Sequence, residues 1–328
     1  MRTSKRTLAA LLAVCLSTLA FQSVAADKEQ YPTKPIKLIV PFLPGGTVDI
    51  VGRLIGRHLN ERLGQPVIVE NRAGAGGTIG ANLVAKSEAD GYTLLFTAQG
   101  PLVMNPFLMK DLPYDAQTAF APVSVVAEAP NVLAVSPAMK VRSVQEFVAY
   151  AKAHPEKMTF ATQGIGTTGH ITGVMMKQQM GISLVHVPYK GFQSMYLDVV
   201  SNRVGMLITD TFNVVPRVRS KELVAIAVAA KKRSSVLPDV PTFAESGYPE
   251  VVAGPWFSIV APAGTPMSVR NRLAGEIQEI LKMPVVAAKL KDLGAEEKGT
   301  TPEQFAAFLK PEYKRWGDTI QAAGITVN

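Results

Sequence analysis

The stretch that decides the fold is Leu38-Ile-Val-Pro-Phe-Leu-Pro-Gly-Gly-Thr-Val-Asp49, an apolar strand that runs into a glycine turn and then into a helix. The same order recurs in Val67-Ile-Val-Glu-Asn-Arg-Ala-Gly-Ala-Gly-Gly-Thr78 and in Met158-Thr-Phe-Ala-Thr-Gln-Gly-Ile-Gly-Thr-Thr-Gly-His170. Each junction directs backbone N–H groups and the positive end of a helix toward one point, which suits an anion. No reactive group stands beside these junctions, so the pattern favours binding without catalysis.

The alternation of strands and helices from Ile36 onward predicts the α/β class, with largely parallel strands and helices on both faces. We expect strands at 36–41, 67–70, 92–97, 131–136, 158–162, 183–187, 204–208, 223–229 and 256–261. We expect helices at 49–63, 78–86, 143–153, 267–281, 285–293 and 302–323, and further helices between the three strands that start at 158, 183 and 204.

The section after Gly254 is mostly helical and too short to form a domain alone, so we expect it to pack on the first part of the chain. This predicts a discontinuous lobe 1 at 27–129 plus 257–328 and a lobe 2 at 130–256, with two chain crossings near 128–131 and 253–257. Two α/β lobes joined by two crossings form a hinge. The carboxyl ends of strands from both lobes would face the cleft, where open α/β sheets bind ligands.

Residues 1–26 have the pattern of an export signal, with a basic start, an apolar run at 8–21 and small residues at 23–26. We expect cleavage near Ala25 or Ala26 and a periplasmic protein. An uncleaved membrane anchor is the alternative, but the apolar run is too short to span a bilayer. A lipoprotein processed at Cys15 is a second alternative, which the bulky Val14 disfavours.

Cleavage there removes the only cysteine, so the mature chain has no disulfide and must rely on its core. It also lowers the formal net charge from +8 to +5, because Arg2, Lys5 and Arg6 are lost. A mildly basic exported protein suits an acidic small ligand, although simple solubility explains the charge equally well. The tight basic run at 231–233 follows an apolar strand and is expected to be a solvated strand end, so we predict no nucleic-acid partner.

The stretch Gly164-Ile-Gly-Thr-Thr-Gly169 matches GxGxxG, but the next strand ends in His186-Val-Pro-Tyr-Lys190 without the carboxylate that a dinucleotide site wants. We interpret it as a carboxylate cradle rather than a dinucleotide site. The expected contacts are backbone N–H groups and two hydroxyls, from Gln163, Gly164, Gly166, Thr167, Thr168 and His170. A plain helix-start turn is the alternative.

The first junction predicts a second cradle at Gly45, Gly46 and Thr47, where the glycines let the chain approach a ligand closely. Asp49 is expected to cap the helix and brace this loop, and Phe42 either lies against the ligand or packs in the core. A third cradle at 73–77 would use Ala75 and Gly76, although a tight strand-to-helix turn explains that stretch as well.

Catalytic and metal motifs are missing from the sequence. The histidines His58, His154, His170 and His186 have no metal-ligand spacing, and there is no GxSxG, HExxH or Walker lysine. We therefore expect no metal, no cofactor and no enzymatic activity. Asp210 follows a strand, where it either closes the site or caps the next helix.

Several motifs together resemble the receptor family of tripartite tricarboxylate transporters, also called Bug proteins. They occur in order along nearly the whole mature chain: Tyr31-Pro-Thr-Lys-Pro35, Val40-Pro-Phe-Leu-Pro-Gly-Gly46, Glu70-Asn-Arg-Ala-Gly-Ala-Gly-Gly77, Asp90-Gly-Tyr-Thr93, His186-Val-Pro-Tyr-Lys-Gly191, Leu237-Pro-Asp-Val-Pro-Thr242, Glu245-Ser-Gly247 and Ala261-Pro-Ala-Gly-Thr-Pro266.

The resemblance implies a two-lobe periplasmic-binding-protein fold, the Venus flytrap, with a small organic carboxylate in the cleft. It implies that loops 44–49 and 163–170 grip one carboxylate, partly through ordered water. The far end of the ligand would meet variable residues, here Thr97, Gln99, Tyr189, Asp210, Asn213 and Trp256. This chain departs from its relatives at three places. It has Asp210-Thr211 where they often have Asp-Asn, Thr47-Val-Asp49 where they often have Ala-Thr-Asp, and Ala73 where they often have Pro. These differences leave the identity of the ligand open.

The predicted function is a monomeric periplasmic receptor that delivers its carboxylate to the large and small membrane subunits of a tripartite transporter. The alternatives are the ligand-binding component of a sensor-kinase pathway and an exported α/β enzyme. An enzyme would need a nucleophile and a base within hydrogen-bond reach.

Overall fold

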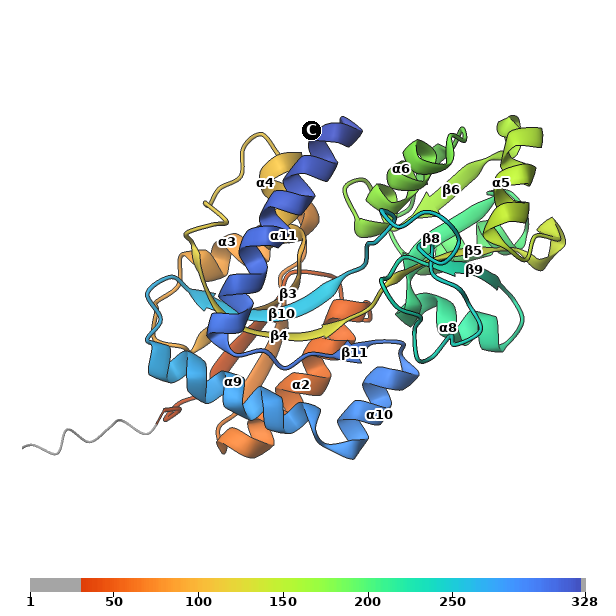
Figure 1. Ribbon diagram of the computed structural model, residues 1–328. Helices are drawn as coiled ribbons and strands as arrows, with labels where there is room; N and C mark the ends of the chain where they lie inside the picture. The colour runs from red at the N-terminus through yellow and green to blue at the C-terminus, as the bar shows by residue number, and fades with distance from the viewer. Residues whose placement is uncertain (1–30, 326–328) are drawn as a thin grey trace, which may run out of the picture.

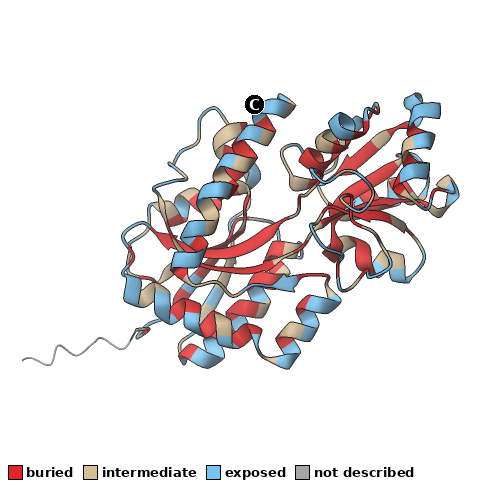
Figure 2. Ribbon diagram, viewed as in Figure 1, coloured by how far each residue is buried: buried red, intermediate tan, exposed pale blue. Residues whose placement is uncertain are grey.

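The computed structural model describes residues 31–325, which form two mixed sheets, each covered by helices on both faces (Figure 1). The predicted export signal and Cys15 lie outside the described residues. We call the six-stranded sheet with its helices lobe 1, and the five-stranded sheet with its helices lobe 2. Each lobe has its own apolar layers, and the central strands of each sheet are the most continuously buried elements (Figure 2).

Lobe 1 contains a sheet with the strand order β11-β4-β10-β3-β1-β2. The strands are β1 (Ile36–Val40), β2 (Val67–Asn71), β3 (Thr93–Ala98), β4 (Phe120–Glu128), β10 (Trp256–Pro262) and β11 (Glu296–Glu297). Side chains alternate across the sheet. Leu38, Leu94 and Phe96 face α2 (Thr47–Leu63), α9 (Met267–Leu281) and α10 (Pro284–Asp292). Ile39 and Leu95 face the opposite layer, made of α3 (Thr78–Ala85), η1 (Ala75–Gly77), η2 (Gly100–Met104), α4 (Asn105–Leu108) and α11 (Pro302–Ala323).

Lobe 2 contains a sheet with the strand order β7-β6-β8-β5-β9. The strands are β5 (Asn131–Val135), β6 (Thr159–Thr162), β7 (Val185–Pro188), β8 (Met206–Asp210) and β9 (Val224–Val228). On one face lie α5 (Val144–Ala153) and α6 (Thr168–Met180), and on the other lie α7 (Phe192–Val200) and α8 (Thr211–Arg219). The short turns η3 (Pro137–Met139) and η4 (Pro155–Lys157) flank α5.

The prediction of largely parallel sheets is wrong. Among the described strands, four pairings are parallel and five are antiparallel. The reason is that β5 and β10 each begin where the chain enters a lobe. Asn131 pairs with Asp210 at the end of β8, and Phe257 pairs with Ala98 at the end of β3. A strand that starts at the edge of the sheet where its neighbours end must run antiparallel to them.

The other expected strands and helices occur within two residues of their predicted bounds. The prediction missed β4 and α8, as well as the shorter η2, α4 and β11. Two prolines explain the larger omissions. Pro122 interrupts the apolar pattern of β4, and Pro216 lies inside α8, where a proline argues against a helix.

The two chain crossings lie side by side, and β4 and β10 run together into lobe 1 (Figure 1). The amide of Ala129 donates to Pro255 O at 2.9 Å, and the amide of Asn131 donates to Ala253 O at 3.0 Å. Gly254 is required here, because a Cβ would lie 2.6 Å from the carbonyl oxygen of Ala129. The hinge is therefore a short backbone ladder packed too tightly for a side chain.

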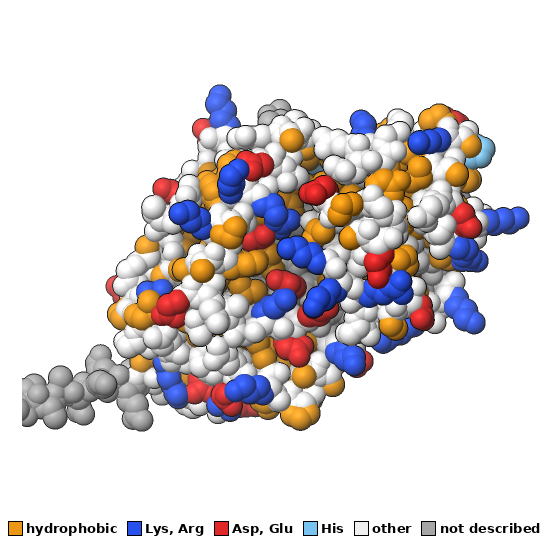
Figure 3. All heavy atoms as spheres, viewed as in Figure 1, with side chains coloured by type: hydrophobic (Ala, Val, Ile, Leu, Met, Phe, Trp, Pro, Cys, Tyr) orange, Lys and Arg blue, Asp and Glu red, His pale blue; other side chains and the backbone are white. Residues whose placement is uncertain are grey.

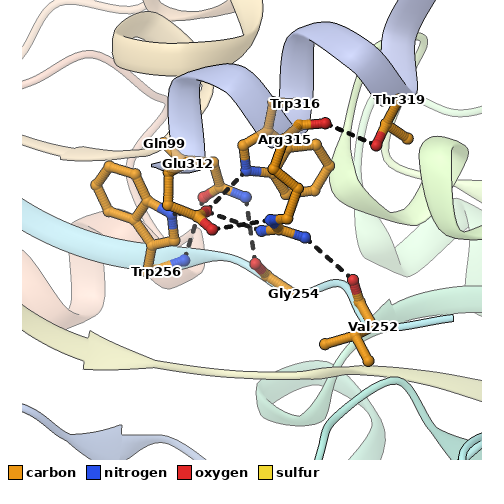
Figure 4. A network of polar contacts seen from close by, with 8 residues as sticks. All are labelled: Gln99, Val252, Gly254, Trp256, Glu312, Arg315, Trp316 and Thr319. Carbon is orange, nitrogen blue, oxygen red and sulfur yellow. Dashed lines mark hydrogen bonds and ion pairs between the residues drawn. The ribbon is translucent and has the colours of Figure 1, made fainter. Parts of the chain in front are cut away.

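A polar network joins the second crossing to α11 (Figure 4). Gln99 donates to Gly254 O at 3.3 Å and accepts from the amide of Trp256 at 3.1 Å. Arg315 donates to Val252 O at 3.2 Å and forms an ion pair with Glu312. The C-terminal helix thus holds the hinge segment against lobe 1.

Candidate functional site

The two glycine turns with the strongest anion-binding pattern follow β1 and β6, and the strand registers place both at the hinge. β3 ends at Ala98 opposite Phe257, and β1 runs parallel to β3, so the turn after β1 lies on that same edge of its sheet. β8 ends at Asp210 opposite Asn131, and β6 runs parallel to β8. Both turns therefore occupy the sheet edges that meet the crossings, which is where open α/β sheets bind ligands.

In the turn after β1, Asp49 braces the backbone. Its carboxylate accepts from the amide of Gly45 at 2.9 Å, from Asn71 Nδ2 at 2.8 Å and from Arg53 Nε at 3.0 Å. Burial alone would raise the pKa of Asp49, but the hydrogen bonds from Arg53, Gly45 and Asn71 outweigh it and hold that pKa below its usual value. Gly45 has φ +82°, a conformation that favours glycine.

The start of α2 remains available to an anion. Gly46 is its N-cap residue, and no side chain of the described residues caps this helix. Gly45 and Gly46 are exposed, and Thr47 is half-buried. The first amides of a helix have no partner within the helix, so those of α2 are free to bind a guest oxygen.

In the turn after β6, the hydroxyl groups have partners within the protein. Thr167 Oγ1 donates to Gly164 O at 2.8 Å and, as the N-cap of α6, accepts from the amide of His170 at 3.4 Å. Thr168 Oγ1 donates to Asn131 Oδ1 at 3.4 Å, which ties the start of α6 to the first crossing. Gln163 Oε1 accepts from Thr209 Oγ1 at 3.2 Å. These contacts leave backbone amides as the principal donors for a ligand, and those of Gly164 and Gly166 are themselves bonded to Thr162 and His170.

Two histidines lie under this turn. The rings of His170 and His186 stack with centroids 3.9 Å apart and an interplanar angle of 12°. The amide of Gly166 donates to His170 Nδ1 at 3.2 Å, and His186 Nε2 lies 2.6 Å from Thr162 Oγ1. Burial lowers the pKa of His170, and burial together with His170 lowers the pKa of His186 to about 4. Both rings are therefore neutral at pH 7.

The third loop, after β2, packs against the first. Phe42 is half-buried, and its ring lies against Gly77. Asn105 Nδ2 donates to Gly76 O and to Thr78 Oγ1, each at 3.1 Å, which holds the loop to η2 and α4. Ala75 has φ +46°, and Ala75 and Gly76 are exposed. The structure brings the first and third predicted loops together on one edge.

Thr97, Gln99 and Trp256 are buried in this conformation, with exposures of 0%, 1% and 2%. Thr97 Oγ1 donates to Ala98 O at 2.9 Å, and Trp256 Nε1 donates to Glu312 Oε2 at 3.1 Å. Gln99 forms the hydrogen bonds to the second crossing described above. The polar groups of all three side chains are therefore bonded within the protein. A direct ligand contact for these three residues stays a prediction.

The remaining predicted residues come from lobe 2. Asp210 is the N-cap of α8, and its Oδ1 accepts from Asn213 N at 3.2 Å and from Asn213 Nδ2 at 3.0 Å. Burial raises the pKa of Asp210 to about 6 against the lowering effect of these hydrogen bonds. Tyr189 donates to Asp198 Oδ2 at 2.7 Å, and desolvation and this bond raise its pKa to about 12.

Three residues at or next to these turns were not predicted as site residues. His186 is a polar residue in an otherwise apolar strand, which was the available signal. Leu43 and Ile165 are apolar residues beside the turn glycines, and 68% and 51% of their surfaces are exposed. Their exposure depends on tertiary structure, so no sequence pattern reveals it.

The described residues contain no cluster of three or more histidine, cysteine or acidic side chains that could hold a metal ion. Within residues 31–325, no helix combines the length and the apolar character needed to cross a bilayer. On the face seen in Figure 3, basic and acidic side chains are interspersed, without a broad patch of one sign.

Comparisons with known proteins identify the family. Residues 51–325 match the tripartite tricarboxylate transporter family receptor, TctC. Protein BugT of Bordetella pertussis is 38% identical over 317 residues, which cover 96% of this chain and 97% of BugT. A protein of R. palustris solved with adipate is 34% identical with a TM-score of 0.84, over 90% of this chain and 100% of that one. MatC of Rhodopseudomonas palustris, solved with bound malate, is 30% identical with a TM-score of 0.79, over 88% of this chain and 100% of that one. The chain therefore belongs to the Bug family of tripartite tricarboxylate transporter receptors, periplasmic solute-binding proteins of the two-lobe fold.

Proposed function

We propose that this protein captures a small organic carboxylate between its lobes and delivers it to the large and small membrane subunits of a tripartite transporter. The observation that carries the proposal is the uncapped start of α2 at one hinge-facing edge, opposite the glycine turn of α6 at the other. The residues of both turns, 42–47 and 163–168, are exposed or half-buried. Adipate and malate, bound to the two related proteins, are both carboxylates, which supports the same ligand class here.

The proposed mechanism needs only binding and closure. A carboxylate held by charge-assisted hydrogen bonds gains at most about 1.5–3 kcal/mol from each. A ligand that contacts both lobes binds the closed form more tightly than the open form, and this difference in affinity shifts the population toward closure. Lobe 1 would comprise residues 27–129 and 257–328, and lobe 2 would comprise residues 130–256. Closure would then bend only the two crossings.

The proposal assigns no chemical step to the protein. It places a monomeric receptor in the periplasm after removal of residues 1–26, with the ligand as its small-molecule partner. Transfer to the membrane subunits then requires only that the closed form be recognised and that the ligand be released there.

The first test is a thermal-shift panel on the signal-free protein. Adipate, malate and benzoate are compared with their uncharged amide analogues. We expect at least one carboxylate to raise the melting temperature and the amides to have no effect. An equal response to the amides would overturn the carboxylate assignment.

The second test places a competing carboxylate on the protein. Gly46→Asp is compatible with the backbone, because Gly46 has φ −78° and ψ 167° and a Cβ would meet only Leu43 O, at 3.6 Å. The new side chain caps α2, which changes stability by only a few tenths of a kcal/mol relative to glycine. It also occupies the proposed anion site, so we expect the carboxylate-induced shift to disappear.

The matched control is Pro266→Asp. Pro266 is the exposed N-cap residue of α9, which follows β10 at the edge of the sheet away from the hinge. This variant adds the same charge to another uncapped helix start and is expected to keep the full ligand response. A full response in Gly46→Asp would remove the start of α2 from the site.

A further inference from the structure

We propose that the stacked rings of His170 and His186 position the glycine turn at 164–168 for ligand binding, and that they do so only while both rings are uncharged. This inference rests on the proposed carboxylate-binding function and adds a positioning role and a pH limit to it. In this role neither ring touches the ligand.

The rings form a stack on three elements of lobe 2. His170 comes from the first turn of α6, His186 from β7, and Phe160 from β6. The His170 and His186 centroids are 3.9 Å apart, and Phe160 stacks on His186 at 4.8 Å with an interplanar angle of 28°. His170 is 9% exposed. The three stacked rings therefore pack beneath the turn and support it.

One ring is bonded to the middle of the turn directly, and the other is linked to its start through the hydroxyl of Thr162. The amide of Gly166 donates to His170 Nδ1 at 3.2 Å, which requires a lone pair on Nδ1 and places the ring proton on Nε2. His186 Nε2 lies 2.6 Å from Thr162 Oγ1, and that hydroxyl accepts from the amide of Gly164 at 3.3 Å. The pair thus fixes the orientation of both glycine peptides.

The amides of Gly164 and Gly166 are occupied by these bonds, which leaves the amides of Ile165, Thr167 and Thr168 to the ligand. The bond from Gly166 N–H to His170 Nδ1 fixes one peptide of the turn and thereby restrains its neighbours. Because affinity depends on preorganised donors, loss of this bond is expected to weaken binding even if the ring is remote from the ligand.

Protonation of either ring opposes this arrangement. A proton on His170 Nδ1 would face the N–H of Gly166, donor against donor, and two stacked cations would repel each other. The charged groups on the elements packed around the pair include Lys177 on α6, Lys190 after β7, Asp198 on α7, Asp210 at the end of β8, and Arg315 and Asp318 on α11. None of them contributes to the lowered pKa of His170 or of His186, so no carboxylate compensates a charged ring.

The test compares three forms of the signal-free protein. His170→Asn keeps an acceptor near the position of Nδ1 but cannot titrate, and His170→Phe keeps a flat ring but loses the acceptor. The affinity for adipate, malate and benzoate is measured by calorimetry from pH 8 to pH 4, and circular dichroism checks that each variant is folded.

At pH 8 we expect His170→Asn to bind within about threefold of the wild type, and His170→Phe about tenfold more weakly. Toward pH 4 the wild type is expected to lose affinity relative to His170→Asn, by up to about tenfold per pH unit once His170 takes up a proton. Protonation of the ligand itself affects both proteins equally and cancels in this ratio.

Nuclear magnetic resonance of the imidazole nitrogens provides a second readout that does not depend on a ligand. We expect His170 to be the Nε2–H tautomer and to titrate with a pKa below the usual range of a histidine. A His170 that binds the ligand as a cation would make binding tighter in acid, and this result would overturn the proposal. Equal affinity in His170→Phe and the wild type at pH 8 would also overturn it. Failure of the wild type to bind any of the three probes would instead overturn the proposed function, and this inference with it.

Discussion

The carboxylate of Glu312 on α11 accepts the indole N–H of Trp256 at 3.1 Å, where the chain leaves the hinge and enters β10 (Figure 4). The same oxygen accepts a hydrogen bond from Trp316 Nε1 at 2.9 Å, and the guanidinium of Arg315 forms an ion pair with the Glu312 carboxylate at 2.8 Å. Glu312 is 9% exposed. One buried carboxylate therefore joins the C-terminal helix to the strand that carries the second crossing.

Substitution of Glu312 by Gln should destabilise the protein by about 2 kcal/mol, because the amide cannot satisfy two indoles and a guanidinium together. Chemical denaturation measures the change. Asp318→Asn on the same helix is the control, because Asp318 pairs with Lys314 while both side chains are mostly exposed, and such pairs contribute under about 1 kcal/mol. Equal effects of the two substitutions would contradict the role given to Glu312.

Substitution of Thr167 by Val should cost about 1 kcal/mol of stability, because Thr167 caps α6 and donates to Gly164 O. It should also weaken carboxylate binding by loosening the turn. Thr167→Ser keeps both bonds and should retain both properties. Thr168→Val should leave stability nearly unchanged, since the bond of its hydroxyl to Asn131 is 3.4 Å long. Loss of affinity in Thr168→Val alone would indicate that Thr168, not Thr167, serves the ligand.

The strand–turn–helix junctions were predictable because their signals are local. Apolar runs, glycine turns and helix starts such as Leu38–Asp49 fix the positions of β1 and α2 without knowledge of the rest of the chain. The two crossings were predictable from the order of the elements. The alternation of strands and helices does not reveal the antiparallel direction of β5 and β10, which follows from the position at which each enters its sheet.

The internal partners of the site residues could not be predicted, because they depend on tertiary contacts. The sequence does not reveal that the hydroxyl of Thr167 bonds to Gly164 O, or that His186 stacks on His170 from a different element. Glu312 and Trp256 are 56 residues apart, and no spacing rule connects them. Predictions of residue type at the turns are therefore sounder than predictions of which atom faces the ligand.

The buried carboxyl of Asp210 predicts a pH dependence of stability. Burial raises its pKa from 3.8 to about 6, so the folded protein binds a proton that the unfolded chain does not bind between about pH 4 and pH 6. This proton stabilises the fold in acid, and its contribution is lost as the pH rises through about 6. Asp210→Asn caps α8 equally well and does not titrate.

We therefore expect Asp210→Asn to be more stable than the wild type at pH 8, by about 1–3 kcal/mol, and equal to it near pH 4. Urea denaturation at both pH values measures the difference. The lowered pKa values of His170 and His186 act in the opposite direction, destabilising the fold as pH falls below about 6.5, but they are common to both proteins and cancel. A wild type more stable than Asp210→Asn at pH 8 would contradict this prediction.

Leu43 and Ile165 predict a preference for ligands with a hydrocarbon body. They stand beside the glycines of the two opposed turns with 68% and 51% of their surfaces exposed, and a bound ligand would cover them. Adipate has a longer hydrocarbon chain than malate and no hydroxyl group, so it should bind more tightly, by about 0.8 kcal/mol for each additional buried methylene.

Leu43→Ser and Ile165→Ser should each weaken the affinity for adipate several-fold and change the affinity for malate by less than twofold. Val285→Ser, at a valine on α10 that is 62% exposed, is the control and should change neither affinity. Equal losses for adipate and malate would show that these side chains shape the turns rather than contact the ligand.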